Sequence, residues 1–319
     1  MKRAEKVQIA ERLSQGISST EWVTVGLIMT CYLLWGLAGL VLMPLSLPAG
    51  LAAMAVLTAL HSSLTHEALH GHPTRCDLVN EFLVCLPLSV FYPYRRYKMT
   101  HIAHHRDETI TDPIEDPESY YKTRFQYDRL PLWLRHLFRL NNSLLGRVTA
   151  GPVLSVVIFY ADDIRRLARA ERGVVLSWML HLPAAAIVLA LVGAMGLPIW
   201  LYLVAVVWPA LGLISLRSFA EHRWHDRPEG RTIIVEKSWL SLVFLNNNLH
   251  LVHHAHPDLP WYQLPLRYQA EKQRWQARSC GYVFPDYTAL WMRWAVCAKE
   301  PVLHPSEVSP DDDADNRQQ

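Results

Sequence analysis

The chain has 319 residues, of which 51% are hydrophobic, and its formal net charge is only +2. Because so small a charge is spread along the chain rather than gathered in one basic tract, the sequence excludes a nucleic-acid-binding protein. Five cysteines without a C-x-x-C spacing likewise exclude a disulfide framework and a zinc finger. The apolar residues are concentrated in long uncharged runs, which indicates one membrane-embedded unit.

Four apolar runs approach the length that crosses a bilayer, about 20 residues for about 30 Å of hydrocarbon. Prolines separate the first two runs and a Gly-Leu-Pro turn separates the last two, so each pair is predicted to form a helical hairpin. The first run is too long for a signal peptide, and we expect it to be retained. Two shorter runs, 78–92 and 150–160, are expected to form re-entrant, interfacial or buried helices. The predicted spans are residues 22–43, 49–65, 174–195 and 199–216.

Lysine and arginine residues determine the predicted orientation. Both hairpin turns lack them, whereas the N-terminus and the segment from Arg95 to Arg172 are rich in them, so both termini are predicted to be cytoplasmic. We expect residues 1–21 to form a cytoplasmic N-terminal segment and residues 22–300 to form a single domain. Residues 301–319 end in an acidic stretch without apolar anchors and are predicted to be a disordered tail.

Twelve of the 16 histidines fall in four short clusters. The first cluster, His66-Glu67-Ala68-Leu69-His70, stands where the second apolar run ends. On a helix, a spacing of four residues puts His66 and His70 on one face, where both imidazoles can bind the same metal. Two solvent-facing histidines at the end of a helix would give the same pattern.

Two further clusters share the spacing H-x-x-H-H, which puts the first histidine of each beside the other two on a helical surface. Such sets are unusual as core filling, because every buried imidazole needs a polar partner. A basic surface patch is the alternative for the earlier of the two clusters. The repetition, together with the first cluster, indicates metal binding. The residues are His101, His104 and His105, and His250, His253 and His254.

His222 stands just beyond the fourth apolar run, beside Glu221. Alone it would be interpreted as a histidine at a helix end. Its predicted side of the membrane is the same as that of the other clusters, and this side was derived from lysine and arginine positions rather than from histidines. We therefore include it in a single site to which all four clusters contribute.

These clusters supply nine candidate ligands, more than one tetrahedral zinc ion accepts, so two metal ions are predicted. Imidazole binds zinc, copper, iron and nickel, and the ligand set leaves the element open. Three nearby acids are candidates to orient the ring nitrogens, although each would also be ordinary as a surface charge. The ligands are His66, His70, His101, His104, His105, His222, His250, His253 and His254, and the acids are Glu67, Asp107 and Glu221.

The order and spacing of the clusters resemble the histidine boxes of the membrane fatty-acid desaturase superfamily, which also contains alkane hydroxylases, carotenoid ketolases and carotenoid hydroxylases. The resemblance extends from about the first span to Pro265, and the stretch NNNLHLVHHAHPDLPWYQLP is similar to the third box of bacterial desaturase-like proteins. It implies an all-α integral membrane protein, with four transmembrane helices in two hairpins and a cytoplasmic helical cap that carries the boxes. A bacterial inner membrane is the expected location.

The resemblance also implies two iron ions held by the nine histidines, with O2 as co-substrate. Electrons would come from an external donor, either a ferredoxin, a flavodoxin or a haem protein. Asn246 or Asn247 is a candidate to complete the ligand set through water. The implied substrate is a lipid or acyl chain from the surrounding membrane lipids, and the implied reaction is the introduction of a C=C bond.

Other functions remain open from the sequence. A hydroxylase or ketolase acting on an alkyl chain, a carotenoid or a small amino-acid-derived substrate would use the same fold and metals. A zinc transporter is the alternative from a different class, but it should place ionisable residues along its spans. His181 lies well inside a predicted span, and a histidine bonded within the bundle would explain it.

Overall fold

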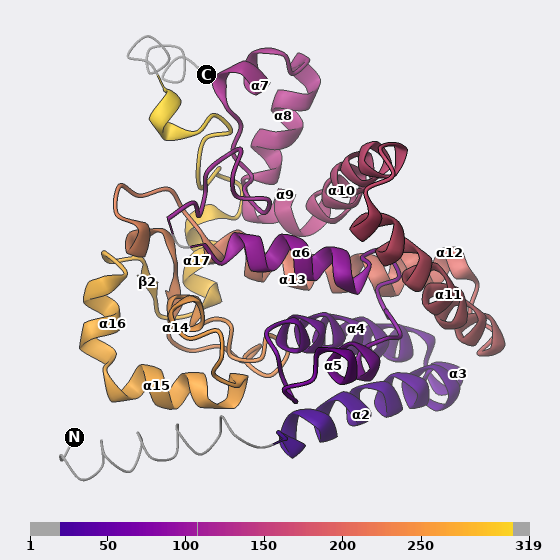
Figure 1. Ribbon diagram of the computed structural model, residues 1–319. Helices are drawn as coiled ribbons and strands as arrows, with labels where there is room; N and C mark the ends of the chain where they lie inside the picture. The colour runs from indigo at the N-terminus through magenta and orange to yellow at the C-terminus, as the bar shows by residue number, and fades with distance from the viewer. Residues whose placement is uncertain (1–19, 107, 309–319) are drawn as a thin grey trace.

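The spanning helices follow the hydrophobic pattern of the chain. The computed structural model describes residues 20–106 and 108–308, and four helices in these ranges are long and apolar enough to cross a membrane (Figure 1). Each hairpin joins two of them. The spans are α2 (Trp22–Leu37) continued by η1 (Ala38–Leu42) and α3 (Met43–Leu45), α4 (Leu47–Leu69), α11 (Arg172–Ala194), and α12 (Ile199–Tyr202) continued by η2 (Leu203–Val207) and α13 (Trp208–Glu221).

The predicted all-α membrane architecture is confirmed, although two spans extend further toward the histidine clusters than predicted. α4 extends to Leu69 and α13 to Glu221, past the polar residues at which the hydropathy pattern ended. Helical hydrogen bonding does not stop where hydrophobicity stops, and these two extensions carry the helices into the histidine clusters. The N-terminal segment predicted for residues 1–21 lies, up to residue 19, outside the described residues.

The bundle is held by apolar packing between the two hairpins. α4 packs against both α2 and α13, and Trp35, Met54, Val188 and Val206 are among the buried side chains that meet there. Tyr202 is fully buried in the same cluster, and its hydroxyl donates a 2.6 Å hydrogen bond to the carbonyl of Leu88. The irregular segment after α5 is therefore fixed to the bundle.

The two shorter apolar runs differ in outcome. The run at 78–92 forms only α5 before it becomes irregular, whereas the run at 150–160 forms the first part of the 18-residue helix α10. Neither is among the candidate spans found in the described ranges. The helices that connect the two hairpins are α5 (Asp77–Leu83), α6 (Tyr94–His104), α7 (Arg124–Asp128), α8 (Leu132–Asn141), α9 (Leu144–Thr149) and α10 (Gly151–Ala168).

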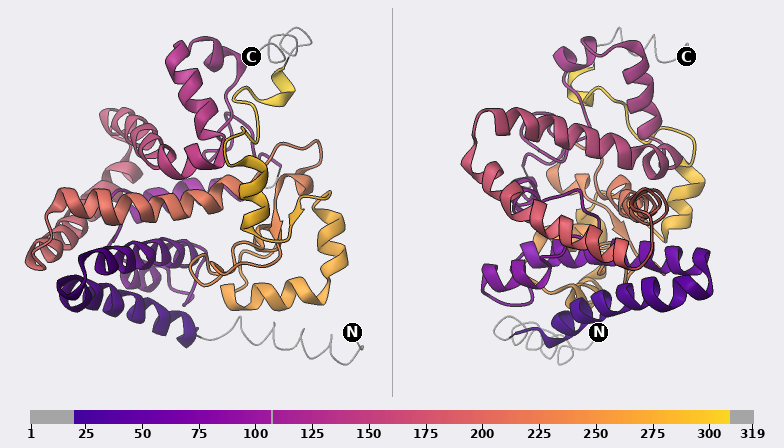
Figure 2. Two further views of the ribbon diagram at one scale, coloured as in Figure 1. Left: turned by 180° about the vertical axis from the view of Figure 1, so that it is seen from behind. Right: turned by 90° about the vertical axis from the view of Figure 1, so that its right-hand side faces the viewer.

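A cap of short elements follows the fourth span and lies over one end of the bundle (Figures 1 and 2). A two-stranded parallel sheet in this cap pairs Ile234 with Val283 and Val235 with Phe284. It ties the segment before the third histidine cluster to the C-terminal part of the chain. The elements are η3 (Pro228–Arg231), β1 (Ile234–Val235), α14 (His250–Ala255), η4 (Trp261–Gln263), α15 (Leu264–Ala270), α16 (Lys272–Arg278), β2 (Val283–Phe284), α17 (Tyr287–Trp294) and η5 (Pro305–Glu307).

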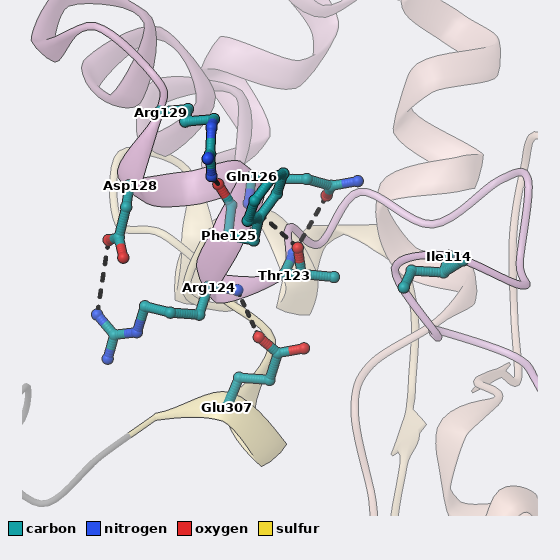
Figure 3. A pocket seen from close by; sticks show the side chains of 8 residues that line it. All are labelled: Ile114, Thr123, Arg124, Phe125, Gln126, Asp128, Arg129 and Glu307. Atoms are coloured by element: carbon teal, nitrogen blue, oxygen red, sulfur yellow. Dashed lines mark hydrogen bonds and ion pairs between the residues drawn. The ribbon is translucent and has the colours of Figure 1, made fainter.

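Residues 301–308 correct the predicted start of the disordered tail, because they pack against the rest of the chain. Val302 and Leu303 are buried, and Leu303 forms a β-bridge with Lys122. Glu307 accepts a hydrogen bond from the backbone N–H of Arg124 at the start of α7, beside an open pocket that both residues line (Figure 3). The remaining part of the predicted tail, residues 309–319, lies outside the described residues.

Candidate metal centre

The nine histidines predicted as ligands come from four separate segments. α4 carries His66, and His70 is its C-terminal cap residue; His222 directly follows α13. α6 carries the first two histidines of the second cluster and His105 caps its C-terminus, while α14 carries the whole third cluster. The H-x-x-H-H spacing is helical in both places, as predicted.

The structure brings these nine side chains together in two adjacent groups. Within each group, one ligand nitrogen of every histidine lies within 4.8 Å of the others, and six of the nine residues are buried. His105 and His254 stack between the groups with ring centroids 4.1 Å apart. The larger group is His66, His70, His101, His105 and His253, and the smaller is His104, His222, His250 and His254.

The helix α14 is positioned by backbone hydrogen bonds to the small sheet. The N–H of Val235 donates to the carbonyl of Asn248, and the N–H of Leu251 donates to that of Ile233. The Asn248 side chain donates back to the Val235 carbonyl at 2.7 Å. Strand β1 therefore holds both the start of α14 and the turn before it, which orients the third cluster toward the first two.

Three acceptors fix the proton on the Nδ1 atom of a histidine in the cluster. Asp116 accepts from His104 and Glu118 accepts from His101, both at 2.8 Å. The side-chain oxygen of Asn247 accepts from Nδ1 of His250, also at 2.8 Å. Because a neutral imidazole carries only one N–H, the Nε2 atoms of these three rings bear lone pairs directed into the cluster.

The spacing of the Nε2 atoms fits a bound cation. Nε2 of His222 lies 2.9 Å from Nε2 of His104 and 3.0 Å from Nε2 of His250. An N–H at Nε2 of His222 could donate to only one of these two lone pairs. The second lone pair would then have no hydrogen-bond donor at this distance. Metal–nitrogen bonds of about 2.0–2.1 Å separate neighbouring ligand nitrogens by roughly 3 Å. The donor set thus fits a metal ion in the smaller group.

The larger group shows the same spacing, since Nε2 of His105 lies 3.0 Å from Nε2 of His101. The buried Nε2 atoms of His66, His70 and His253 have no hydrogen-bond partner among the described residues. Buried polar atoms are normally paired, and unpaired ones indicate a missing ion or water. These three orphaned nitrogens are accounted for if they coordinate a metal.

Burial keeps most of the cluster neutral, as ligation requires. Desolvation and then the neighbouring imidazoles lower the pKa of the ligands outside the spans. His104 differs: burial acts to lower its pKa, but the carboxylates of Glu118 and Asp116 raise it to about 9. A cation at Nε2 would replace the proton that these carboxylates otherwise attract. The histidines with a lowered pKa are His70, His105, His222, His250, His253 and His254.

The predicted partners of the ligands take different positions. Glu221 forms an ion pair with Arg217 at 2.8 Å and accepts from the amide of Asn247 at 3.2 Å, so Asn247 links it to His250. Glu67 instead accepts from the backbone N–H of Trp261 at 2.8 Å. The Asn246 side chain also turns to Trp261, where it donates to the carbonyl at 3.0 Å. Asp107 lies outside the described residues.

Asp116 and Glu118 were not among the predicted site residues. They lie in the loop after α6, separated by 12 and 17 residues from the histidines that they contact. The side chain of Asp116 is 2% exposed, and burial raises the pKa of Glu118 less than His101 and His104 lower it, to about 2. The one signal in the sequence is the density of acids in the stretch DPIEDPE.

Three histidines near the clusters stay outside the two groups. Nδ1 of His72 lies 2.5 Å from a carboxylate oxygen of Glu21, at the start of the first span. His225 accepts from the backbone N–H of Arg227, and His256 accepts from Nε of Arg267. None of these three had been assigned as a ligand from the sequence.

The geometry defines a class: an integral membrane protein in which two helical hairpins and a cap gather histidines into a site suited to metal ions. A family model described as fatty acid desaturase matches residues 40–285, more than half of the chain. The chain belongs to the fatty acid desaturase family, which confirms the resemblance seen in the histidine clusters, and it is a membrane oxidoreductase of the desaturase or oxygenase kind. No curated protein matches it.

Proposed function

We propose that this protein is an O2-dependent acyl-chain desaturase that holds two iron ions in its nine histidines. The observation that carries the proposal is the convergence of Nε2 lone pairs in two adjacent groups of five and four imidazoles. Two sites side by side suit chemistry at a pair of metal ions, and family membership favours iron among the elements that imidazole accepts.

Bound iron would supply the activation of O2 that removes hydrogen from an unactivated alkyl chain. In the balanced reaction the substrate loses two hydrogen atoms and gains a C=C bond, while O2, two electrons and two protons join those hydrogens in two water molecules. The electrons come from an external donor, a ferredoxin, a flavodoxin or a haem protein. The contribution of the chain itself is to position the ligands and to exclude bulk water.

Positioning is the role we assign to Asp116, Glu118 and Asn247. Each holds one imidazole by Nδ1, so the ring cannot rotate its Nε2 away from the group. Burial of these histidines keeps solvent from the reacting position.

The membrane side of the cluster favours an acyl substrate. α4 carries Leu60 and Leu64 on the turns before His66, and both pack in a buried apolar cluster with Ile28 of α2. An alkyl chain that approaches from the bilayer would meet apolar side chains up to the histidines. We place the histidine end of the bundle in the cytoplasm, because the lysines and arginines are concentrated on that side of the spans.

Hydroxylation or ketolation of an alkyl chain, a carotenoid or an amino-acid derivative begins with the same removal of hydrogen and is the second candidate. A zinc transporter is less consistent with the spans. His61 in α4 is bonded to the Tyr32 hydroxyl at 2.8 Å, and His181 in α11 to the Val90 carbonyl at 2.9 Å. Nε2 of each of these two rings is thus bonded to the protein rather than available to a moving ion.

Elemental mass spectrometry on the detergent-purified protein tests the metal. We expect about two irons per chain, lost in His105→Ala and in His253→Ala. His136→Ala, an exposed histidine on α8, is the matched control and should keep both irons. One zinc per chain, or a metal content unchanged by the two cluster variants, would overturn the di-iron assignment.

Mass spectrometry of lipids from cells that express the protein tests the reaction. A desaturase yields acyl chains lighter by two hydrogens, whereas a hydroxylase yields products heavier by one oxygen. The His253→Ala variant should yield neither. Oxygenated products that depend on His253, without unsaturated ones, would replace desaturation by hydroxylation on the same site.

A further inference from the structure

The segment from α7 to α8 projects from the body of the molecule as an arm. In Figure 1 and in both views of Figure 2 it stands away from the spanning helices, and α8 runs across the direction of α2. The arm is attached through α9, which packs against both α8 and α13. Its base therefore lies on a spanning helix, and the arm extends sideways from the bundle.

The outer face of this arm is apolar. Leu132 and Trp133 are 68% and 66% exposed, and Leu140, about two helical turns later, is 51% exposed on the same side of α8. Phe125 of α7 is 65% exposed. The opposite side of α8 is occupied, because Phe138 and Asn141 are buried against the body. The packing of α8 against the body therefore does not use these exposed side chains.

Basic side chains accompany this apolar face. Arg129 is exposed and holds its guanidinium 3.4 Å from the centre of the Phe125 ring. Arg139 is exposed on α8 beside Leu140. Leucine, tryptophan and phenylalanine combined with arginine are the composition of helices that lie in the headgroup region of a membrane.

The apolar exposure continues from the arm toward the spans. Leu145 of α9 and Val153 and Val157 of α10 are exposed as well, and α10 packs against the spanning helices α11 and α13. Exposed apolar side chains on α8, α9 and α10 therefore mark a strip that leads from the arm to the spanning helices. The bilayer is the one partner that is already in place along this whole strip.

We propose that the α7–α8 arm lies on the membrane surface, with Leu132, Trp133 and Leu140 inserted among lipid headgroups and with Arg129 and Arg139 on the phosphates of anionic lipids. Each arginine near an anionic surface adds to the attraction between the arm and the lipids. The arm would hold the cap against the bilayer, independently of the reaction that the metal centre catalyses.

Spin-label accessibility tests the arm in the full-length protein. A nitroxide is attached at Trp133→Cys, in a background where the cysteines other than the buried Cys31 are serine. Nanodiscs of phosphatidylcholine with and without phosphatidylglycerol are compared. We expect collisions with O2 to exceed collisions with a water-soluble nickel complex several-fold, and the ratio to rise with phosphatidylglycerol. Leu132→Cys gives a second labelling position.

Two matched variants complete the test. A label at Glu229→Cys, exposed in the cap, should favour nickel in both lipids. In Arg129→Glu/Arg139→Glu the effect of phosphatidylglycerol should disappear. Nickel accessibility at position 133 equal to that at position 229 would overturn the proposal. Dipolar broadening between labels would also overturn it, because a second copy of the chain, rather than lipid, would then cover the face.

Discussion

Oδ1 of Asp116 lies 2.8 Å from Nδ1 of His104, and its other oxygen accepts the backbone N–H of Thr111 at 2.9 Å. Both groups are buried, so the carboxylate cannot rotate without losing one of these bonds. The loop after α6 is thereby fastened to the second histidine cluster. Because Nε2 of His104 contacts Nε2 of His222, this loop is also linked to the end of the fourth span.

Asp116→Asn should weaken metal binding in the smaller group. The amide no longer attracts the Nδ1 proton with a full charge, so His104 becomes a poorer and less fixed ligand. Loss of such a partner typically costs about 10–100-fold in metal affinity. Competition titration with a chelator measures this change. Glu115→Gln, whose side chain is exposed next to Asp116, is the control, and equal affinities for the two variants would contradict the role of the carboxylate.

His222→Ala should lose metal from the smaller group, whereas His225→Ala should keep it. The two histidines are three residues apart, but Nε2 of His222 meets His104 and His250, and Nδ1 of His225 accepts from the backbone of Arg227. Metal content per chain and the thermal midpoint, measured for both variants, separate ligation from general destabilisation. Retention of metal in His222→Ala would remove this residue from the site.

Much of the centre could be predicted because its ligands are grouped at helical spacing. The spacing of His66 and His70 predicts that both lie on one face of a helix, and the spacing of each H-x-x-H-H cluster predicts the same for its histidines. No knowledge of tertiary contacts is needed for this. Asp116 and Glu118 carry no such periodicity, since they reach their histidines through a loop. Asn247 was predicted near the site, but its contact with Nδ1 rather than with a metal depends on the turn that β1 imposes.

The spans were predictable for the same reason, since a run of apolar residues needs no partner to be recognised. The ordered segment 301–308 was not. Val302 and Leu303 form only a short apolar stretch, and their partner Lys122 lies far away in the sequence. The order of residues 301–308 depends on tertiary packing, which cannot be predicted from composition or residue spacing.

Arg96→Ala should destabilise the fold far more than Arg95→Ala. Arg96 is buried and joins Asp163 of α10 at 2.7 Å, and Asp163 also accepts from the indole of Trp178 in α11. Removal of one partner of a buried pair leaves a buried charge and costs about 3–5 kcal/mol. Arg95 pairs with Glu81 at the partly exposed surface, where a pair contributes about 0–1 kcal/mol. Thermal unfolding in detergent compares the two variants, and equal shifts would contradict the difference in burial.

Lys299→Met should make the position of His222 less fixed, although it changes no metal-ligating side chain. Nζ of Lys299 donates to the backbone carbonyl of His222 at 2.6 Å and to that of Phe219, at the end of α13 where carbonyls have no helical partner. Loss of hydrogen bonds from such a donor costs about 1.5–3 kcal/mol. Because the lost hydrogen bonds lie next to one ligand, we expect a lower thermal midpoint together with weaker metal binding. Lys237→Met, at an exposed position, should change neither quantity. A lower midpoint with unchanged metal affinity would show that Lys299 stabilises the end of α13 but does not position His222.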